Sequence, residues 1–290
     1  MIDIDINPDL AARVRAGEPP ARAELEALDG ADVLSLGMLA DEVRRARVGR
    51  EVRFVRVLRI GGPIEPAAAA SLAGCHEVRL TAPGESLAAT LERVREARVL
   101  AGATRLTGFS LSDLHARGWA SLTTVASELR GAGLDALAEA TVDEVSAEQL
   151  AAVVAAGLPV ATLAVRSATG HGRVDLVLAA RALVEACPAM VAFAPLALQQ
   201  PVTAPTTGYH DVRMVALARL ALPTVPTIGV DWEQFGPKLA QVALTFGANL
   251  LDGVPPVDDE TLGRRRATVE ELRRNIRSAG FEPVEAGAPA

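Results

Sequence analysis

The chain has 290 residues, half of them apolar but only 3% aromatic, and a formal net charge of −7. An acidic chain of this kind does not favour nucleic acid as a partner. The start, MIDIDINPDL, lacks the basic and apolar regions of a signal peptide, and no run of about 18 apolar residues predicts a membrane span. The two cysteines, Cys75 and Cys187, give neither a disulfide framework nor a metal-ligand spacing. We therefore expect a cytoplasmic protein with neither a membrane nor a nucleic-acid partner.

The first fifty residues predict helices. Pro8 and the pair Pro19-Pro20 each precede a short helical stretch. Residues 31–49 follow, with apolar positions at a helical spacing and a stop signal at Gly49.

From Glu51 the pattern changes to short apolar strands that alternate with helices. The predicted strands are 52–60, 77–81, 104–109, 134–137, 159–165, 190–196, 225–230 and 249–251. The predicted helices are 86–98, 122–131, 147–156, 173–186, 209–221, 237–246 and 268–279. Strand runs such as VAFAPLAL are apolar almost throughout, which is typical of a buried parallel sheet.

Eight βα-like steps in roughly 200 residues favour a (β/α)8 TIM-type barrel. An open Rossmann-like sheet is the alternative, although no G-x-G-x-x-G motif follows a strand. The expected organisation is an N-terminal helical extension over residues 1–50 and the barrel over 51–258. A C-terminal helix and tail over 259–290 are expected to pack on the barrel.

Several stretches, in order along the chain, resemble one family of enzymes. They are LSLGMLADEVRRAR (34–47), TGFSLSDL (107–114), AGLDALAEA (132–140), LPVATLAVRSATGHGRVD (158–175), FAPLALQQP (193–201), the long block 211–254, and FEPVE (281–285). They are similar to segments of the menaquinone-pathway branch of the radical S-adenosylmethionine (SAM) enzymes. This branch includes aminofutalosine synthase, dehypoxanthine futalosine cyclase and the related FO synthase subunit. The resemblance implies a radical SAM-like barrel, a reaction at the C-terminal ends of its strands, and a link to menaquinone biosynthesis by the futalosine pathway.

The chain departs from this family at its cysteines. The family carries a C-x-x-x-C-x-x-C motif after the first barrel strand, whose thiolates hold a [4Fe–4S] cluster with SAM on the fourth iron. Here the corresponding stretch, residues 59–78, contains one cysteine, Cys75. Of the family's glycine-rich segment after the second strand, Gly84 and Glu85 are left. We therefore expect a degenerate member, a pseudoenzyme that lacks the iron–sulfur cluster and the usual SAM site.

The expected loops at the C-terminal face of the barrel carry polar side chains that form a candidate ligand site. The predicted catalytic residues are His171, Glu139 and Asp231, with His171 as an acid or base beside a carboxylate. The predicted ligand-binding residues are Arg59, Ser110, Asp113, Arg166, Gln199 and Trp232. No metal ligand is predicted.

These residues also have ordinary structural explanations, because polar surface loops are common. Ser110 and Asp113 fit the start of a helix as well as an anion site. His171 fits a surface loop, and Trp232 fits either a stacking surface for a purine or aromatic acid or a plug in the barrel mouth.

Three functions follow from these observations. The first is a barrel without cofactor that binds a small molecule, such as a nucleoside or an aromatic acid, or that binds an active radical SAM paralogue. The second is a redox-neutral lyase or hydrolase that uses a histidine and a carboxylate at the barrel mouth. The third is a protein–protein scaffold with a filled barrel.

Overall fold

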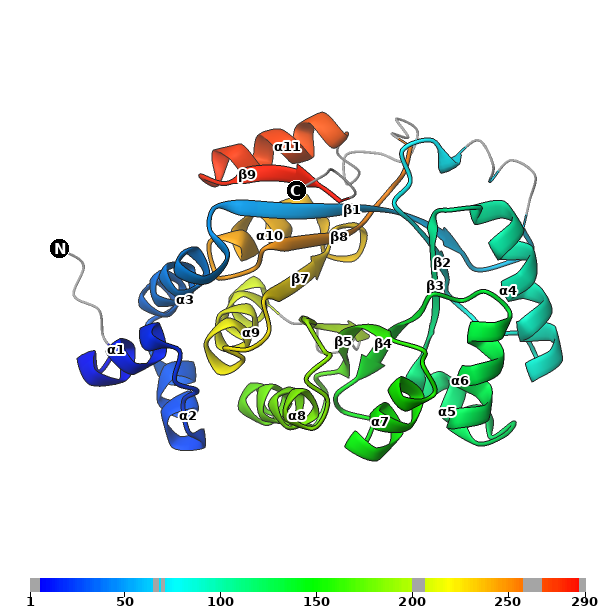
Figure 1. Ribbon diagram of the computed structural model, residues 1–290. Helices are drawn as coiled ribbons and strands as arrows, with labels where there is room; N and C mark the ends of the chain where they lie inside the picture. Colours follow the sequence, from blue (N-terminus) through cyan, green and yellow to red (C-terminus); the bar gives the residue numbers. More distant parts are fainter. Residues whose placement is uncertain (1–5, 65–67, 69–70, 200–206, 258–267, 287–290) are drawn as a thin grey trace.

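Eight parallel strands close into a barrel surrounded by helices in the computed structural model of the protein (Figure 1). The structure describes residues 6–64, 68, 71–199, 207–257 and 268–286. Each strand pairs in parallel with the next, and β8 pairs with β1, which closes the barrel. The strands are β1 (Glu51–Ile60), β2 (Glu77–Leu80), β3 (Arg105–Ser110), β4 (Ala136–Thr141), β5 (Val160–Ser167), β6 (Ala192–Gln199), β7 (Thr227–Asp231) and β8 (Leu250–Val254). The predicted (β/α)8 barrel is confirmed, and the open sheet is not formed.

Helices connect the strands and cover the outside of the barrel. They are α4 (Leu87–Ala101), α5 (Leu111–Arg117), α6 (Leu122–Gly131), α7 (Ala147–Ala155), α8 (Arg173–Ala186), α9 (Gly208–Ala221) and α10 (Trp232–Leu244). Ser86, Ser121, Ser146 and Thr207 each cap a helix by accepting a hydrogen bond from the backbone N–H three residues later. Local capping chemistry therefore explains why the predicted helix starts agree closely with the observed ones.

Helix α10 begins five residues before its predicted start at Pro237. Asp231 caps its first turn by accepting from the backbone N–H of Gln234 (2.8 Å). Gly236 then takes a positive φ of 76°, and Pro237 begins the next stretch of helix. The Gly-Pro pair marks a kink inside the element rather than its beginning.

Three helices precede the barrel, as expected: α1 (Pro8–Ala16), α2 (Arg22–Gly30) and α3 (Val33–Val48). In α3, a Cβ on Gly37 would lie 2.6 Å from the ring of Phe246, so glycine permits this close approach. Two buried arginines, Arg44 on α3 and Arg219 on α9, donate to backbone carbonyl groups just before β8. Arg44 bonds to Ala248 and Arg219 bonds to Gly247. These hydrogen bonds satisfy the guanidinium of Arg219 away from water, whereas Nη2 of Arg44 is buried without a hydrogen-bond partner.

The C-terminal elements, α11 (Val269–Ser278) and β9 (Glu282–Glu285), lie beside β1 in Figure 1. The first half of β1 pairs in parallel with β9, and its second half pairs with β2. Leu272 and Ile276 of α11 are fully buried. Strand β9 was not predicted, because its four residues, EPVE, carry no apolar alternation.

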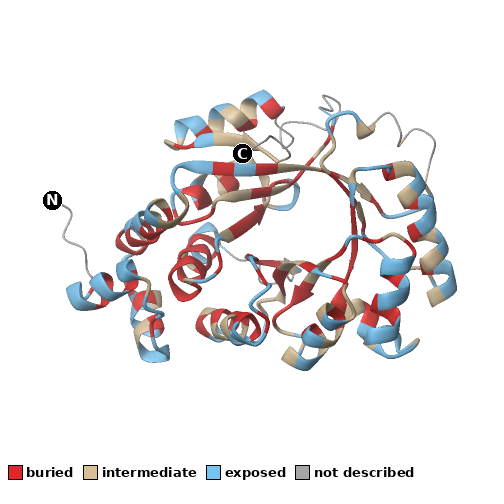
Figure 2. Ribbon diagram, in the orientation of Figure 1, coloured by how far each residue is buried: buried red, intermediate tan, exposed pale blue. Residues whose placement is uncertain are grey.

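The core lies between the strands and the surrounding helices. Figure 2 shows buried residues along the strands and on the inward faces of the helices. Fully buried side chains such as Val78, Leu106, Leu163 and Ile228 come from the strands. With few aromatic residues, the helices pack closely through alanines, several of which are fully buried in α9. None of the described helices combines the length and apolar character that crossing a bilayer requires.

Candidate ligand-binding site at the C-terminal end of the barrel

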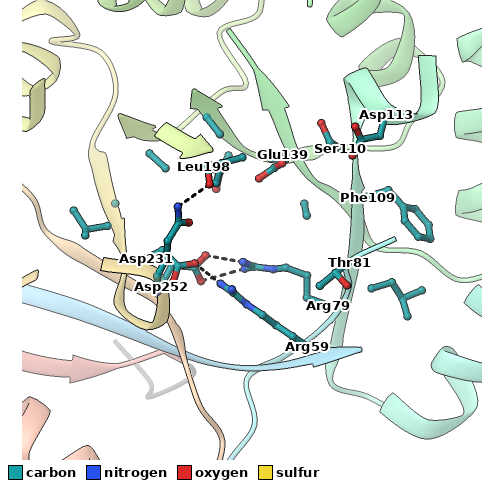
Figure 3. Close-up of a pocket in the computed structure, with 18 of the residues that line it drawn as sticks. Arg59, Arg79, Thr81, Phe109, Ser110, Asp113, Glu139, Leu198, Asp231 and Asp252 are labelled. Atoms are coloured by element: carbon teal, nitrogen blue, oxygen red, sulfur yellow. Dashed lines mark hydrogen bonds and ion pairs between the residues drawn. The ribbon is translucent and has the colours of Figure 1, made fainter. Parts of the chain in front are cut away.

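The barrel strands surround a cavity of about 200 Å³ at their C-terminal ends (Figure 3). Active sites of (β/α)8 barrels lie at this end. Polar and apolar side chains line the cavity, among them Arg59, Arg79, Phe109, Ser110, Asp113, Ala138, Glu139, Thr162, Ala164, Ala194, Leu198, Asp231, Gln234 and Asp252. Its volume is small beside the roughly 300–1,000 Å³ of pockets for drug-sized ligands.

Two arginine–aspartate pairs cross one half of the cavity. Arg59 and Arg79 are register partners on β1 and β2, and Asp231 and Asp252 are register partners on β7 and β8. Arg59 bonds to Asp231, while Arg79 donates two hydrogen bonds to Asp252, at 2.7 and 3.1 Å. Figure 3 shows both guanidinium groups directed toward the two carboxylates. Each arginine therefore reaches past one intervening strand, and the two pairs join β1, β2, β7 and β8.

Arg79 also has a partner on its own strand. Its Nε donates to Oε1 of Glu77 (2.7 Å), and the same oxygen accepts from the hydroxyl of Thr107 (2.6 Å). Burial favours the neutral form of Arg79, but Asp252 and Glu77 outweigh it and raise the pKa of the guanidinium. Burial likewise acts to raise the pKa of Asp252, and Arg79 more than reverses this and lowers it.

Gly253 makes room for the first of these pairs. It has a positive φ of 68°, and a Cβ placed there would lie 2.5 Å from Nη2 of Arg59 and 2.9 Å from a carboxylate oxygen of Asp231. A side chain would therefore be strained by the backbone and would collide with the ion pair.

The other half of the cavity carries one carboxylate between two hydroxyl groups. Ser110, Glu139 and Thr162 are successive register partners on β3, β4 and β5, and all three line the cavity. The side chain of Glu139 forms no hydrogen bond or ion pair with any residue that the structure describes. Burial raises the pKa of its carboxyl group, and the more distant arginines Arg166 and Arg79 only partly offset this effect.

Arg166, at the end of β5, holds the rim above these residues. Its guanidinium donates to Asp113 (2.7 Å), Glu144 (3.0 Å) and Ser112 (2.8 Å). Ser110 is the residue before α5, but its side chain does not cap the helix and bonds instead to Ser112 (2.8 Å). Ser110 and Asp113 therefore lie at the start of a helix, as expected, but the Ser110 side chain does not cap it.

Phe109 has a positive φ of 64°, which is uncommon for a residue with a bulky side chain. It is buried, precedes Ser110 as the penultimate residue of β3, and lines the cavity. Backbone strain of this kind tends to occur at functional sites.

The structure brings together five of the nine predicted site residues. Arg59, Ser110, Asp113, Glu139 and Asp231 line the cavity, and Arg166 contacts two of them from the rim. His171 and Gln199 are exposed and are not among the described lining residues. Trp232 is 1% exposed and is not among them either. The expected pairing of His171 with a cavity carboxylate is therefore not formed.

Sequence reasoning missed Arg79 and its partner Glu77. The signal was present in the strand EVRL, whose alternating charged and apolar residues place Glu77 and Arg79 on one face. Helices cover the outside of a (β/α)8 barrel, so the apolar face of such a strand packs against them and the charged face points into the interior. Gln234 was also missed; its amide donates to the backbone carbonyl of Leu198 (2.8 Å).

The cysteines do not fit the cluster that the family resemblance implies. The Sγ of Cys75 contacts the backbone carbonyl of Glu77 (3.0 Å) at the start of β2, and Cys187 is buried at the end of α8. Neither lines the cavity, and no group of three potential metal ligands occurs among the described residues. The backbone N–H of Gly84 donates to Thr90 (3.0 Å), so it is already bonded within the chain. The sequence therefore lacks the three clustered cysteines with which the family holds a [4Fe–4S] cluster.

The sequence of the C-terminal third matches a family model described as the CofH/MqnC C-terminal region. The match covers residues 183–286. The matched region runs from α8 through the last three barrel strands to β9. The CofH/MqnC match confirms the predicted resemblance to the menaquinone-pathway and FO-synthase type of radical SAM enzymes.

Two curated relatives agree with the CofH/MqnC match. Over 87 residues, the chain is 38% identical to a 5-amino-6-(D-ribitylamino)uracil--L-tyrosine 4-hydroxyphenyl transferase of Methanopyrus kandleri. The aligned region covers 27% of this chain and 23% of that enzyme. Over 134 residues, it is 32% identical to an aminodeoxyfutalosine synthase of Streptomyces coelicolor. This aligned region covers 39% of this chain and 35% of that enzyme. The chain thus spans about a quarter to a third of the length of these relatives.

Solved structures match nearly the whole chain in fold. Methylornithine synthase (PylB) superposes with a TM-score of 0.71 at 15% sequence identity, covering 95% of this chain and 97% of that one. The hydrogenase maturase HydG from Carboxydothermus hydrogenoformans gives 0.71 at 12% identity, covering 97% and 79%. At these identities the likeness concerns the barrel fold alone.

Proposed function

We propose that this chain is a degenerate radical SAM-like barrel that binds a small molecule in its C-terminal cavity without an iron–sulfur cluster. The observation that carries the proposal is the contrast between the cavity and the cysteines. The cavity keeps a polar lining with a free carboxylate, whereas Cys75 and Cys187 both lie outside it. One thiolate near the first two strands cannot hold the three irons that three thiolates hold in the family.

The proposed ligand belongs to the chemistry of menaquinone biosynthesis by the futalosine pathway. Similarity to an aminodeoxyfutalosine synthase supports this link, and nucleosides and aromatic acids are the first compounds to test. An active radical SAM paralogue is the alternative binding partner. We favour the small molecule because the cavity is a defined site with named polar groups.

Anaerobic reconstitution with iron and sulfide, followed by absorption spectroscopy and iron analysis, tests the absence of a cluster. We expect no stoichiometric iron and the same small background in a Cys75→Ser/Cys187→Ser variant. Stoichiometric iron with a charge-transfer band that disappears in the double variant would overturn the proposal.

A thermal-shift screen with nucleosides and aromatic acids tests ligand binding, because a ligand that binds the folded state raises its unfolding midpoint. Ala138→Leu places a larger side chain in the cavity lining and should abolish the shift. A ligand that shifts both proteins equally binds elsewhere, which would contradict the cavity as the site.

A redox-neutral enzyme is the second candidate, and Glu139 favours it. A carboxyl group with a raised pKa in a cavity is suited to general acid or base chemistry. The proposed partner His171 is exposed outside the cavity, so this role would rest on Glu139. Each compound that binds can be incubated with the protein and followed by NMR. Turnover that is lost in Glu139→Gln would identify an enzyme, and unchanged compounds would leave the binding function.

A further inference from the structure

The carboxylates of the cavity outnumber its available cations. Arg59 is paired with Asp231, and Arg79 with Asp252. At the rim, Arg166 is paired with Asp113 in the same way. Glu139 alone among the charged lining residues has no such partner within the described chain.

An anionic ligand would meet an unfavourable site. Each of the three guanidinium groups already donates to a carboxylate, so an anion would have to break an ion pair or remain unpaired. Leaving a partly buried carboxylate without its partner is costly. A cation, in contrast, would supply the counter-charge that Glu139 lacks.

The residues around Glu139 indicate which shape of ligand fits beside its charge. Ser110 and Thr162 flank it on the neighbouring strands. The Ser110 hydroxyl already bonds to Ser112 and Arg166, so the Thr162 hydroxyl is the one that can accept a further N–H group beside the carboxylate. The same half of the cavity is lined by three small apolar side chains, Ala138, Ala164 and Ala194. Small side chains on adjacent strands leave an apolar surface without projecting groups, against which a flat group can pack.

We infer that the cavity takes a small planar organic cation of the amidinium class, with two N–H groups on Glu139 and its apolar part against the three alanines. The paired N–H groups of an amidinium match the two oxygens of a carboxylate. This inference rests on the proposed function, because it requires that the cavity binds a small molecule. It specifies the charge of that molecule and so disfavours the aromatic acids among the proposed ligands.

Benzamidine, benzamide and benzoate test the inference, because they share one shape and differ in charge. Calorimetric titration of the wild-type protein should show that benzamidine binds most tightly of the three. Glu139→Gln, which keeps the shape of the side chain but removes its charge, should weaken benzamidine by about tenfold to a hundredfold. It should leave benzamide nearly unchanged. Glu128→Gln, an exposed substitution on α6 with the same change of charge, should leave all three affinities unaltered.

Tighter binding of benzoate or benzamide than of benzamidine would overturn the inference and leave the proposed binding function intact. Equal benzamidine affinities in wild type and Glu139→Gln would also overturn it. If none of the three probes binds and no compound of the wider thermal-shift screen binds, the proposed function fails as well. Circular dichroism of Glu139→Gln confirms that the variant is folded, and Glu139→Asp, which keeps the charge, should retain part of the benzamidine affinity.

Discussion

At the scale of single residues, Glu139 is the most informative side chain of the cavity. Its carboxyl group is desolvated and lies without a hydrogen-bonding partner among the described residues, whereas the neighbouring carboxylates each hold an arginine. Uncompensated burial of a charge is tolerated in proteins mainly where function requires it. This cost makes Glu139 measurable through stability as well as through binding.

Replacing Glu139 by Gln should stabilise the protein at high pH and have little effect at low pH. The folded-state pKa is raised, so the folded protein holds this proton more tightly than the unfolded chain, whose glutamate pKa is about 4.3. The stability that Glu139 contributes is therefore fully present below the unfolded pKa and is lost as the pH rises through the folded pKa. The neutral Gln variant does not lose it. Urea unfolding of both proteins at pH 4 and pH 8 measures the difference.

The matched control is Glu128→Gln, whose side chain is exposed on α6. The difference in stability between Glu128→Gln and wild type should change much less from pH 4 to pH 8 than the difference for Glu139→Gln. If the gap between Glu139→Gln and wild type stayed constant from pH 4 to pH 8, the raised pKa would be wrong.

At the scale of elements, the two ion pairs join strands that are not neighbours in the sheet. Arg79→Met should destabilise the protein by about 3–5 kcal/mol, because Asp252 and Glu77 would each lose their main cationic partner in a partly buried site. Chemical denaturation measures the loss. Arg95→Met breaks an exposed pair with Glu92 on α4 and should cost about 1 kcal/mol or less.

Adding Asp252→Leu to Arg79→Met separates a charge effect from a packing effect. Removing the second charge should restore part of the lost stability, since replacing both members of a buried pair is often neutral. A double variant that is less stable than Arg79→Met would contradict the assignment of the cost to an unpaired aspartate.

Most of the barrel could be predicted from sequence because the signals for its strands and helices lie within each element. Buried strands such as AFAPLALQ in β6 are continuous apolar runs, and helices such as α7 begin with their own capping residues. Strand β9 carries no such pattern and depends on its pairing with β1, a long-range contact. Helix α10 was shortened in the prediction because the Gly236-Pro237 pair resembles a boundary.

The candidate site was predicted in part for a related reason. Strand order places Glu139 and Asp231 at the same end of a barrel, so their location follows from the alternation of elements. Which arginine meets which aspartate depends on closure, since Arg79 on β2 reaches Asp252 on β8 across β1. His171 lies beyond the end of β5, and the length of that loop, which the strand pattern does not define, leaves it exposed outside the cavity.

At the scale of the whole molecule, buried charge is used differently at different places. The buried Arg44 and Arg219 bond to backbone carbonyl groups beside β8, where they fix helices α3 and α9. At the cavity, the arginines bond to carboxylates, and the carboxylate of Glu139 has no such partner among the residues that the structure describes. In (β/α)8 barrels generally, the N-terminal end of the strands contributes to stability and the C-terminal end carries the functional side chains.

The C-terminal elements should unfold together with the barrel rather than separately. Ile276 of α11 is fully buried and β9 pairs with β1, so the segment completes the core beside the first strand. Ile276→Ala should cost about 2–5 kcal/mol. Both tryptophans, Trp119 and Trp232, lie outside this segment, so their fluorescence reports on the barrel.

In urea, the midpoint from tryptophan fluorescence should fall by as much as the midpoint from far-ultraviolet circular dichroism, because coincident transitions indicate one cooperative unit. Arg274→Ala, an exposed position on the same helix, should leave both midpoints nearly unchanged. A lower midpoint by circular dichroism with an unaltered fluorescence midpoint would show that α11 and β9 detach first. In that case the barrel would be stable without the pairing between β1 and β9, and the segment would be a separate layer on a complete eight-stranded core.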